Sequence, residues 1–409
     1  MNTQSIDRIL RETAYVRTGG SAQELRCAEY LKRECEQLGF SAHLEAFDVP
    51  MAAMQEARLT VDGKEIPCEG YLCAGSWETE APLYYLTGSD PCSLAGCRGR
   101  IVLLDGHLGY WTYQDLLAHG AAGFITYDGD ANYADEDIAR RELRSYVSQG
   151  RRLPGVNINA KSAIALIRDG AKTARITLRQ EETTGQSHNV VCDLPGESGD
   201  VIVLSAHYDS TPLSVGSYDN MSGCIALLAV AQALAPAPRR CTLRLLFCGS
   251  EERGLLGSKA YCAAHAGELG SVVLNVNLDM LGSIMGSFIA CCTSEERLVH
   301  FIEYFASIRG FGVKARQDVY SSDSTPFADR GVPAVSFARI APRNTATIHN
   351  RYDTPAVLSA GQLARDIDFV AAFVQTMVCA RCCPVRREMP DNMKDKLDVY
   401  LARKRDDKA

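Results

Sequence analysis

The stretch Leu204-Ser-Ala-His-Tyr-Asp-Ser-Thr-Pro-Leu-Ser-Val-Gly-Ser-Tyr-Asp-Asn-Met-Ser-Gly223 joins a predicted buried strand to a predicted helix. The strand is the apolar run that ends at Leu204, and another apolar run follows Asn220. Between them the chain carries His207, Asp209 and Asp219 in a loop rich in Gly and Ser. Open α/β sheets place their active sites just past the carboxyl ends of strands. The stretch therefore predicts a cation-binding loop at the edge of such a sheet.

The chain around this loop alternates strand-like and helix-like runs. This alternation predicts an α/β fold, a mixed and largely parallel sheet sandwiched by helices on both faces. The predicted strands are Val201–Leu204, Leu243–Cys248, Val272–Leu278 and Ala334–Phe337, and the predicted helices are Met221–Ala235, Gly257–His265, Glu295–Ile308 and Gly361–Met377.

The remaining segments suggest a domain inserted into the α/β domain. Residues 1–50 are expected to form the first part of the α/β domain, with a helix over Ala22–Gln37 that Ser21 caps. Residues 51–183 mix short strands and helices, which is typical of a smaller α+β or β-rich module. A polar link, Glu181–Ser187, leads back to the α/β domain over 184–385, and the highly charged residues 386–409 form a surface helix or a C-terminal tail.

Composition excludes some classes of function. The 409 residues carry a net charge of −7, which argues against a nucleic-acid surface. No run reaches the ~18 apolar residues that a membrane span requires, so no membrane partner is expected. The first residues lack the apolar core of an export signal, so we expect a cytoplasmic protein in which most of the 16 cysteines are reduced. The oligomeric state stays open, a homodimer included.

Acidic residues and histidines follow several of the predicted strands. Glu251 and Glu252 follow the second strand, Asp279 ends the third, and His349 lies in a later loop. Any one of these would more often be a loop cap or a surface charge than a ligand. Together with His207, Asp209 and Asp219 they would crowd carboxylates that repel one another, unless divalent cations lie between them. Two imidazoles and three carboxylates suit zinc, and a bridging carboxylate would hold two ions roughly 3.5–4 Å apart.

These residues resemble the zinc-dependent exopeptidases of the M28 family, of the aminopeptidase Y and leucyl aminopeptidase type. The likeness covers residues 185 to about 380 and extends to the first helix at Gly20–Gly39. In the inserted module, Gly99-Arg-Ile-Val-Leu-Leu and Ala118-His-Gly-Ala-Ala-Gly-Phe-Ile resemble the protease-associated (PA) domain. The motifs of the catalytic part are His207-x-Asp209, Asp219-Asn220, Gly-Ser-Glu251-Glu252, Asn-x-Asp279-Met, and His349 followed by Asp353-Thr354.

The resemblance implies a zinc-exopeptidase (phosphorylase/hydrolase-like) fold and two zinc ions per chain. Asp219 would bridge the ions, with His207 and Asp279 completing one site. Glu252 and His349 would complete the other site. Asp209 would orient the His207 ring, and Glu251 would be the general base. The family also has a cis peptide after the bridging acid, which would be Asp219-Asn220 here.

One departure from the family concerns the donor that stabilises the oxyanion. Many members have a tyrosine directly before the last histidine, where this chain has Ile348. The segment Tyr320-Ser-Ser-Asp323 resembles the Tyr-Thr-Ser-Asp segment that supplies this tyrosine in some bacterial leucyl aminopeptidases. Tyr320 is therefore the predicted oxyanion donor, with a pocket wall as the alternative. Relatives also read Ser-Asp-His-x-x-Phe, where this chain has Ser324 in place of the histidine.

The predicted function is hydrolysis of the N-terminal peptide bond of short peptides. Met280, Ile348 and Phe327 are expected to line an apolar side-chain pocket. The alternatives are a carboxypeptidase or amide deacylase with the same ions, a single-zinc cyclase, and a non-enzymatic receptor-like protein. A carboxypeptidase would want an arginine facing the substrate carboxylate, and the candidates are Arg339, Arg343 and Arg351. The intact ligand set and Glu251 argue against the receptor-like protein.

Overall fold

A computed structural model describes residues 1–132 and 138–405 and divides the chain into two units. The first unit comprises Met1–Asp48 and Gln186–Ala409, and the second comprises Val49–Gly185. The second unit is thus an insertion into the first. The boundaries expected from the sequence, after residues 50 and 183, lie within two residues of this division.

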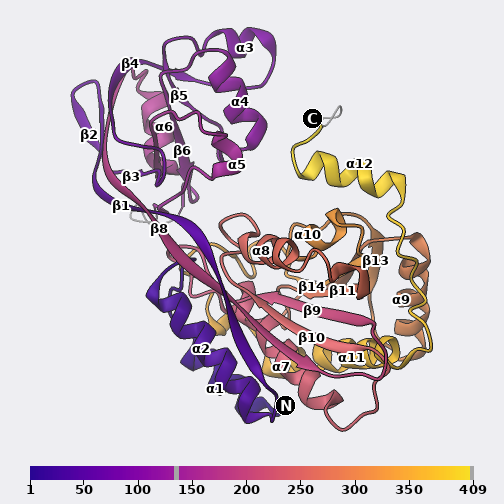
Figure 1. The fold of residues 1–409 in the computed structure, drawn as a ribbon. Coiled ribbons are helices and arrows are strands. Elements are labelled where there is room, and N and C mark those ends of the chain that lie inside the picture. The colour runs from indigo at the N-terminus through magenta and orange to yellow at the C-terminus, as the bar shows by residue number, and fades with distance from the viewer. Residues whose placement is uncertain (133–137, 406–409) are drawn as a thin grey trace. The chain divides into compact units, whose positions relative to one another are not determined.

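The first unit is built on one sheet, with the strand order β13-β12-β14-β11-β9-β10-β8. Figure 1 shows two of its central strands, β9 and β10, side by side. Its four central strands, β14, β11, β9 and β10, are parallel neighbours, whereas β8 and β12 join them antiparallel. This confirms the predicted largely parallel sheet. The bounds are β8 Thr173–Leu194, β9 Val201–His207, β10 Thr242–Cys248, β11 Val272–Leu278, β12 Ser287–Thr293, β13 Lys314–Gln317 and β14 Ala334–Ile340.

Helices cover both faces of this sheet, because alternate side chains of the buried strands point to opposite sides. In β9, Ile202 and Leu204 join the larger core, while Val203 joins a second core on the other face. The larger core packs under α1 Thr3–Glu12, α2 Ala22–Gln37, α7 Ser222–Leu234, α9 Glu296–Ile308 and α11 Ala360–Cys379, and the second under α8 Leu256–Ala264 and α10 Ser324–Asp329.

Two long strands carry the chain between the units. They are β1, Ala42–Val61, and β8, and they pair with each other. The predicted polar link at Glu181–Ser187 is therefore wrong, because these residues continue β8 without a break. Most of their side chains are exposed, so their composition is that of a loop although the backbone stays extended.

The inserted unit has its own apolar core and a small sheet in which β4, β5, β6 and β7 are successive parallel neighbours. Asp62 and Gly63 turn the chain between β1 and β2. The bounds are β2 Lys64–Ile66, β3 Glu69–Gly70, β4 Trp77–Tyr85, α3 Pro91–Ala95, β5 Ile101–Leu103, α4 Tyr110–Ala118, β6 Gly123–Asp128, α5 Ser145–Ser148, β7 Gly155–Asn159 and α6 Ala160–Arg168.

The C-terminal segment is not a free tail over its described part. Residues Asp391–Tyr400 form a helix, α12, that buries Met393 and Leu397. The last part of the expected tail, residues 406–409, lies outside the described residues. All 16 cysteines lie within the described residues, and none of them takes part in a disulfide bond there. None of the helices in the described ranges combines the length and the apolar character needed to cross a bilayer.

Candidate metal centre

The predicted site residues follow strand ends at one edge of the sheet. His207 is the last residue of β9, Glu251 and Glu252 follow β10, and Asp279 follows β11. Because β9, β10 and β11 are parallel neighbours, their carboxyl ends meet at the same edge. His349 joins them from the loop between β14 and η3, Pro355–Val357.

Three buried residues form an inner donor set: His207, Asp219 and Asp279. The Nε2 atom of His207 lies 3.0 Å from Oδ1 of Asp219 and 3.8 Å from Oδ1 of Asp279. One ligand atom from each residue lies within 4.8 Å of the others, the spacing of groups that can hold one ion. All three side chains are at most 8% exposed.

An outer donor set consists of Asp219, Glu252 and His349. The Nε2 atom of His349 lies 3.1 Å from Oδ2 of Asp219 and 3.1 Å from Oε2 of Glu252. The side chain of His349 is 51% exposed, in contrast to every member of the inner set. Asp219 thus offers Oδ1 to the inner set and Oδ2 to the outer set, the arrangement of a bridging carboxylate.

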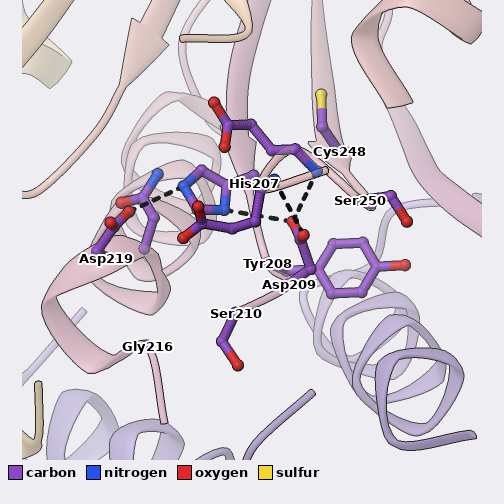
Figure 2. A network of polar contacts seen from close by, with 12 residues as sticks. His207, Tyr208, Asp209, Ser210, Gly216, Asp219, Cys248 and Ser250 are labelled. Carbon is purple, nitrogen blue, oxygen red and sulfur yellow. Dashed lines mark hydrogen bonds and ion pairs between the residues drawn. The ribbon is translucent and has the colours of Figure 1, made fainter. Parts of the chain in front are cut away.

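Asp209 ties the inner histidine to the loop after β10. It is fully buried, and its Oδ1 lies 3.4 Å from Nδ1 of His207. Its two oxygens also accept hydrogen bonds from the backbone N–H groups of Glu251, at 2.9 Å, and Glu252, at 3.2 Å. Figure 2 shows the His207 ring between Asp209 on one side and Asp219 on the other. One carboxylate therefore orients a candidate ligand and the segment that carries two further acids.

The buried charges of the cluster shift one another's pKa values. Burial, reinforced by the charge of Asp219, raises the pKa of Asp279 to about 8. Burial also raises the pKa of Glu251 well above its ordinary value; the positive charge of His207 opposes this shift, and the negative charge of Glu252 adds to it. For Asp219, hydrogen bonds to His207 and His349 outweigh burial and lower the pKa. The raised pKa values mean that some of these carboxyl groups hold protons in the absence of other cations. Divalent cations would take the place of those protons, so the donor set fits such ions.

The loop that carries Asp219 is held by two side chains to which the sequence assigned no role. The guanidinium of Arg17 is fully buried and donates to the carbonyl oxygens of Tyr208, Val215 and Gly216, the last at 2.7 Å. The carboxylate of Asp353 accepts from the backbone N–H of Tyr218 at 2.7 Å and of Asp219 at 3.1 Å. The peptide bond between Asp219 and Asn220 is cis, as the resemblance implied.

Glu24 supports the second acidic loop from helix α2. Ser21 and Glu24 have the spacing of a capping box, and Ser21 Oγ accepts from the N–H of Glu24 at 3.1 Å. The carboxylate of Glu24, however, reaches beyond its helix: Oε1 accepts from the N–H of Ser250 at 2.8 Å and from Oγ of Ser187 at 2.8 Å. Burial, together with the charge of Asp209, raises the pKa of Glu24 to about 7.

The charges of the inner donor set act on Tyr320. Burial and the charges of Asp279 and Asp219 raise the pKa of its phenol far above the ordinary value, which keeps the hydroxyl protonated. Phe327 does not line this pocket as expected: it is fully buried in the core and packs 5.7 Å from the ring of Tyr261. Ser324, in the place of the family's histidine, shares hydrogen bonds with the buried hydroxyls of Ser322 and Ser336.

The structure therefore brings seven of the eight predicted site residues together at one edge of the sheet, and the charges of Asp279 and Asp219 act on the eighth, Tyr320. Their roles stay predictions. What the sequence missed is the support beneath them. Glu24 matched the pattern of a local helix cap, and no pattern marked Arg17. Asp353 belonged to a quoted motif, but only the geometry gives its contacts.

Comparison with known proteins assigns this site to a family. Residues 189–374 match the model of peptidase family M28. Aminopeptidase YwaD of Bacillus subtilis (strain 168) is 27% identical over 361 residues, which cover 85% of this chain and 77% of that protein. A probable leucine aminopeptidase 2 of Aspergillus fumigatus is 28% identical over 275 residues, or 65% of this chain, and the match spans about half (54%) of that relative.

Solved structures share the fold. BSAP, a zinc aminopeptidase from Bacillus subtilis, superposes with a TM-score of 0.77 at 24% identity, over 95% of this chain and 98% of that one. An aminopeptidase from Aneurinibacillus sp. strain AM-1 gives a TM-score of 0.75 at 23% identity, over 95% and 97%. Residues 189–374 of this chain therefore form a peptidase family M28 domain, and the protein is a hydrolase that acts on peptide bonds.

Proposed function

We propose that this chain is an aminopeptidase that removes N-terminal residues from short peptides with two zinc ions. The observation that carries the proposal is the position of Asp219, whose two oxygens lie against two separate donor sets. His207 and Asp279 would complete one zinc site, and Glu252 and His349 the other. Nitrogen and oxygen ligands of this kind suit zinc, and a shared carboxylate is typical of paired ions in aminopeptidases.

When bound, the two zinc ions would polarise the scissile carbonyl group and lower the pKa of the attacking water. Glu251 is the proposed general base. It is a member of neither the inner nor the outer donor set, but its carboxylate lies within 4.8 Å of ligand atoms of His207 and Glu252, one from each set. Its raised pKa suits a carboxylate that accepts a proton from water and then delivers it to the leaving amine. Asp209 positions Glu251 through the backbone N–H of that residue.

Tyr320 is the proposed donor to the oxyanion that forms from the carbonyl oxygen. Burial and the charges of Asp279 and Asp219 keep its phenol protonated, so that it can donate a hydrogen bond. A donor of this kind typically contributes about 2.7–4 kcal/mol to lowering the barrier.

Specificity for the N-terminus is supported by the names of the relatives and by the charge of the site. A free α-amine is a cation, and the acidic residues around the ions would attract it. The carboxypeptidase alternative needs a free arginine, and one of its candidates is committed elsewhere. Arg339 donates to both oxygens of Asp366, at 2.6–3.0 Å, and to the carbonyl oxygen of Gly286 at 2.9 Å.

Zinc-loaded protein should be assayed with three matched substrates: a leucyl dipeptide, the same dipeptide with a blocked amine, and the same dipeptide with a blocked carboxylate. The proposal predicts cleavage of the first and the third. Cleavage of the blocked-amine substrate instead would favour a carboxypeptidase or amide deacylase and would contradict the proposal. The Glu251→Gln variant is the control for contaminating peptidases.

A further inference from the structure

The segment that carries Tyr320 has no regular structure of its own. Residues 318–323 lie between β13 and α10, outside any helix or strand. A loop side chain needs outside support to be held in one position, and a misplacement of only 1 Å can cost ~10²-fold in rate. The neighbours of Tyr320 in the chain are held by the C-terminal helix α12.

A row of polar side chains on α12 lies along this segment and contacts it. Asn392, Lys396 and Tyr400 are spaced by four residues, so they lie on one face of the helix. Asn392 Nδ2 donates to Oε1 of Gln317 at 2.8 Å, and Lys396 Nζ donates to Oδ1 of Asp318 at 2.8 Å. The hydroxyls of Tyr400 and Ser321 lie 2.6 Å apart. The contacts thus advance along the segment, one helical turn at a time, and lie on both sides of Tyr320.

An apolar row lies beside the polar one. Met393 is fully buried and Leu397 nearly so, in a small core with Ala328 and Ala334, and the partly buried Val319 packs against this core. Val319 directly precedes Tyr320. Residues 318, 319 and 321 are therefore all in contact with α12 or with the core that it closes.

We propose that α12 is a positioning element for the reaction, and that Lys396 and Tyr400 hold the Tyr320 segment in the place where its phenol meets the substrate oxyanion. This inference rests on the proposed role of Tyr320. A helix that only covered Ala328 and Ala334 would need its apolar row but not the polar row aimed at residues 317–321. The contacts of the polar row therefore distinguish a helix that positions the Tyr320 segment from one that only covers the apolar core.

The test is a double variant, Lys396→Met with Tyr400→Phe, which leaves Met393 and Leu397 in place. Its matched control is Lys394→Met, because Lys394 lies on the same helix and pairs with Asp391 at 2.9 Å, not with the Tyr320 segment. The double variant should lose roughly tenfold in kcat, part of the ~10²-fold that a 1 Å misplacement can cost, with KM changed by less than about twofold. The control should keep the kcat of the parent.

The same double variant is then made in the Tyr320→Phe background. If α12 acts through Tyr320, the further loss of kcat there should be less than about twofold, because the two changes remove one shared effect. An equal loss in both backgrounds, or no loss in either, would overturn the proposal.

A second measurement separates this inference from the role of Tyr320 itself. Amide hydrogen exchange of residues 317–323 should be faster in the double variant than in Lys394→Met. If Tyr320→Phe alone keeps full activity, the oxyanion role fails and the catalytic part of this inference fails with it. If exchange in 317–323 is unchanged in the double variant, α12 does not hold the segment, whatever Tyr320 does.

Discussion

The two donor sets of the site share Asp219 but differ in how they are built. The two inner residues besides Asp219, His207 and Asp279, lie at the ends of β9 and β11, and both side chains are buried. The outer set depends on His349, which lies in a loop, has a positive φ of 62° and keeps half of its side chain in solvent. One set is held by the sheet, and the other is completed by a loop.

This difference indicates that the two positions should not hold their ions equally well. A ligand set fixed by buried strands is already in place before an ion arrives, whereas a loop ligand must be ordered on binding. The half-exposed side of His349 is also the side that a chelator or a substrate can reach. We therefore expect the inner ion to be retained longest and the outer ion to exchange first.

The largest expected effect concerns Glu251, the proposed general base, which is a ligand in neither donor set. Glu251→Gln should keep both ions and lose about 10²–10⁴-fold in kcat, the usual contribution of a general base. The measurement is kcat on a leucyl dipeptide, with zinc content determined on the same sample. Loss of zinc in this variant would instead make Glu251 a ligand, and unchanged turnover would remove it from the mechanism.

Removing one histidine from each donor set tests whether the inner set holds its ion more tightly than the outer set. His207→Ala should lose the inner ion, with an affinity loss greater than the ~10–100-fold typical of outer-shell changes, and should lower the unfolding temperature because buried carboxylates lose their partner. His349→Ala should keep the inner ion and unfold near the temperature of the parent. Zinc content after dialysis and thermal unfolding of both variants provide the measurement. Equal zinc loss in the two variants would contradict the inner and outer distinction.

A smaller effect is expected from the residue behind the inner histidine. Asp209→Asn keeps the shape of the side chain but removes the charge that faces His207 Nδ1. Zinc affinity or activity should fall by about 10–100-fold, as is usual for partners of metal-bound histidines. Competition with a chromophoric chelator measures the affinity. A variant with the affinity and activity of the parent would show that the ring of His207 is oriented without Asp209.

The smallest effect concerns Glu24, which supports the loop that carries Glu252. Its pKa is raised by burial to about 7, so the folded state holds its proton at a pH where the unfolded chain releases it. This carboxyl therefore favours folding at low pH, and its contribution is lost as the pH rises from about 4.5 through 7. In Glu24→Gln the loss is absent, so the stability of the variant relative to the parent should rise between pH 5 and 8.

Urea unfolding of both metal-free proteins across this range measures the difference in their free energies of unfolding. A difference that stays constant with pH, or that moves in favour of the parent, would show that Glu24 is ionised throughout.

Much of the fold and of the two donor sets could be predicted from the sequence, for a physical reason. Buried strands such as Val201–His207 are continuous apolar runs, and polar side chains directly after them have to meet at one edge of a parallel sheet. Local sequence patterns were misleading at two other places. The polar segment Glu181–Ser187 has the composition of a loop although its backbone is a strand, and Glu24 matched a capping box while its carboxylate reaches Ser250.

The long-range supports could not be predicted, because they depend on contacts between residues far apart in the chain. Arg17 holds the carbonyl oxygens of Val215 and Gly216, roughly two hundred residues away. Helix α12 has the charged composition of a tail, and its buried Met393 and Leu397 have meaning only beside Ala328 and Ala334. No spacing along the sequence reports such contacts.

The central claim is that Asp219 joins two ions, and anomalous diffraction at the zinc edge from crystals of the zinc-loaded protein tests it most directly. The claim predicts two peaks at the edge of the sheet, each about 2.0–2.2 Å from a different oxygen of Asp219. One peak should also contact His207 and Asp279, and the other Glu252 and His349. A single peak, or two peaks of which only one contacts Asp219, would contradict it.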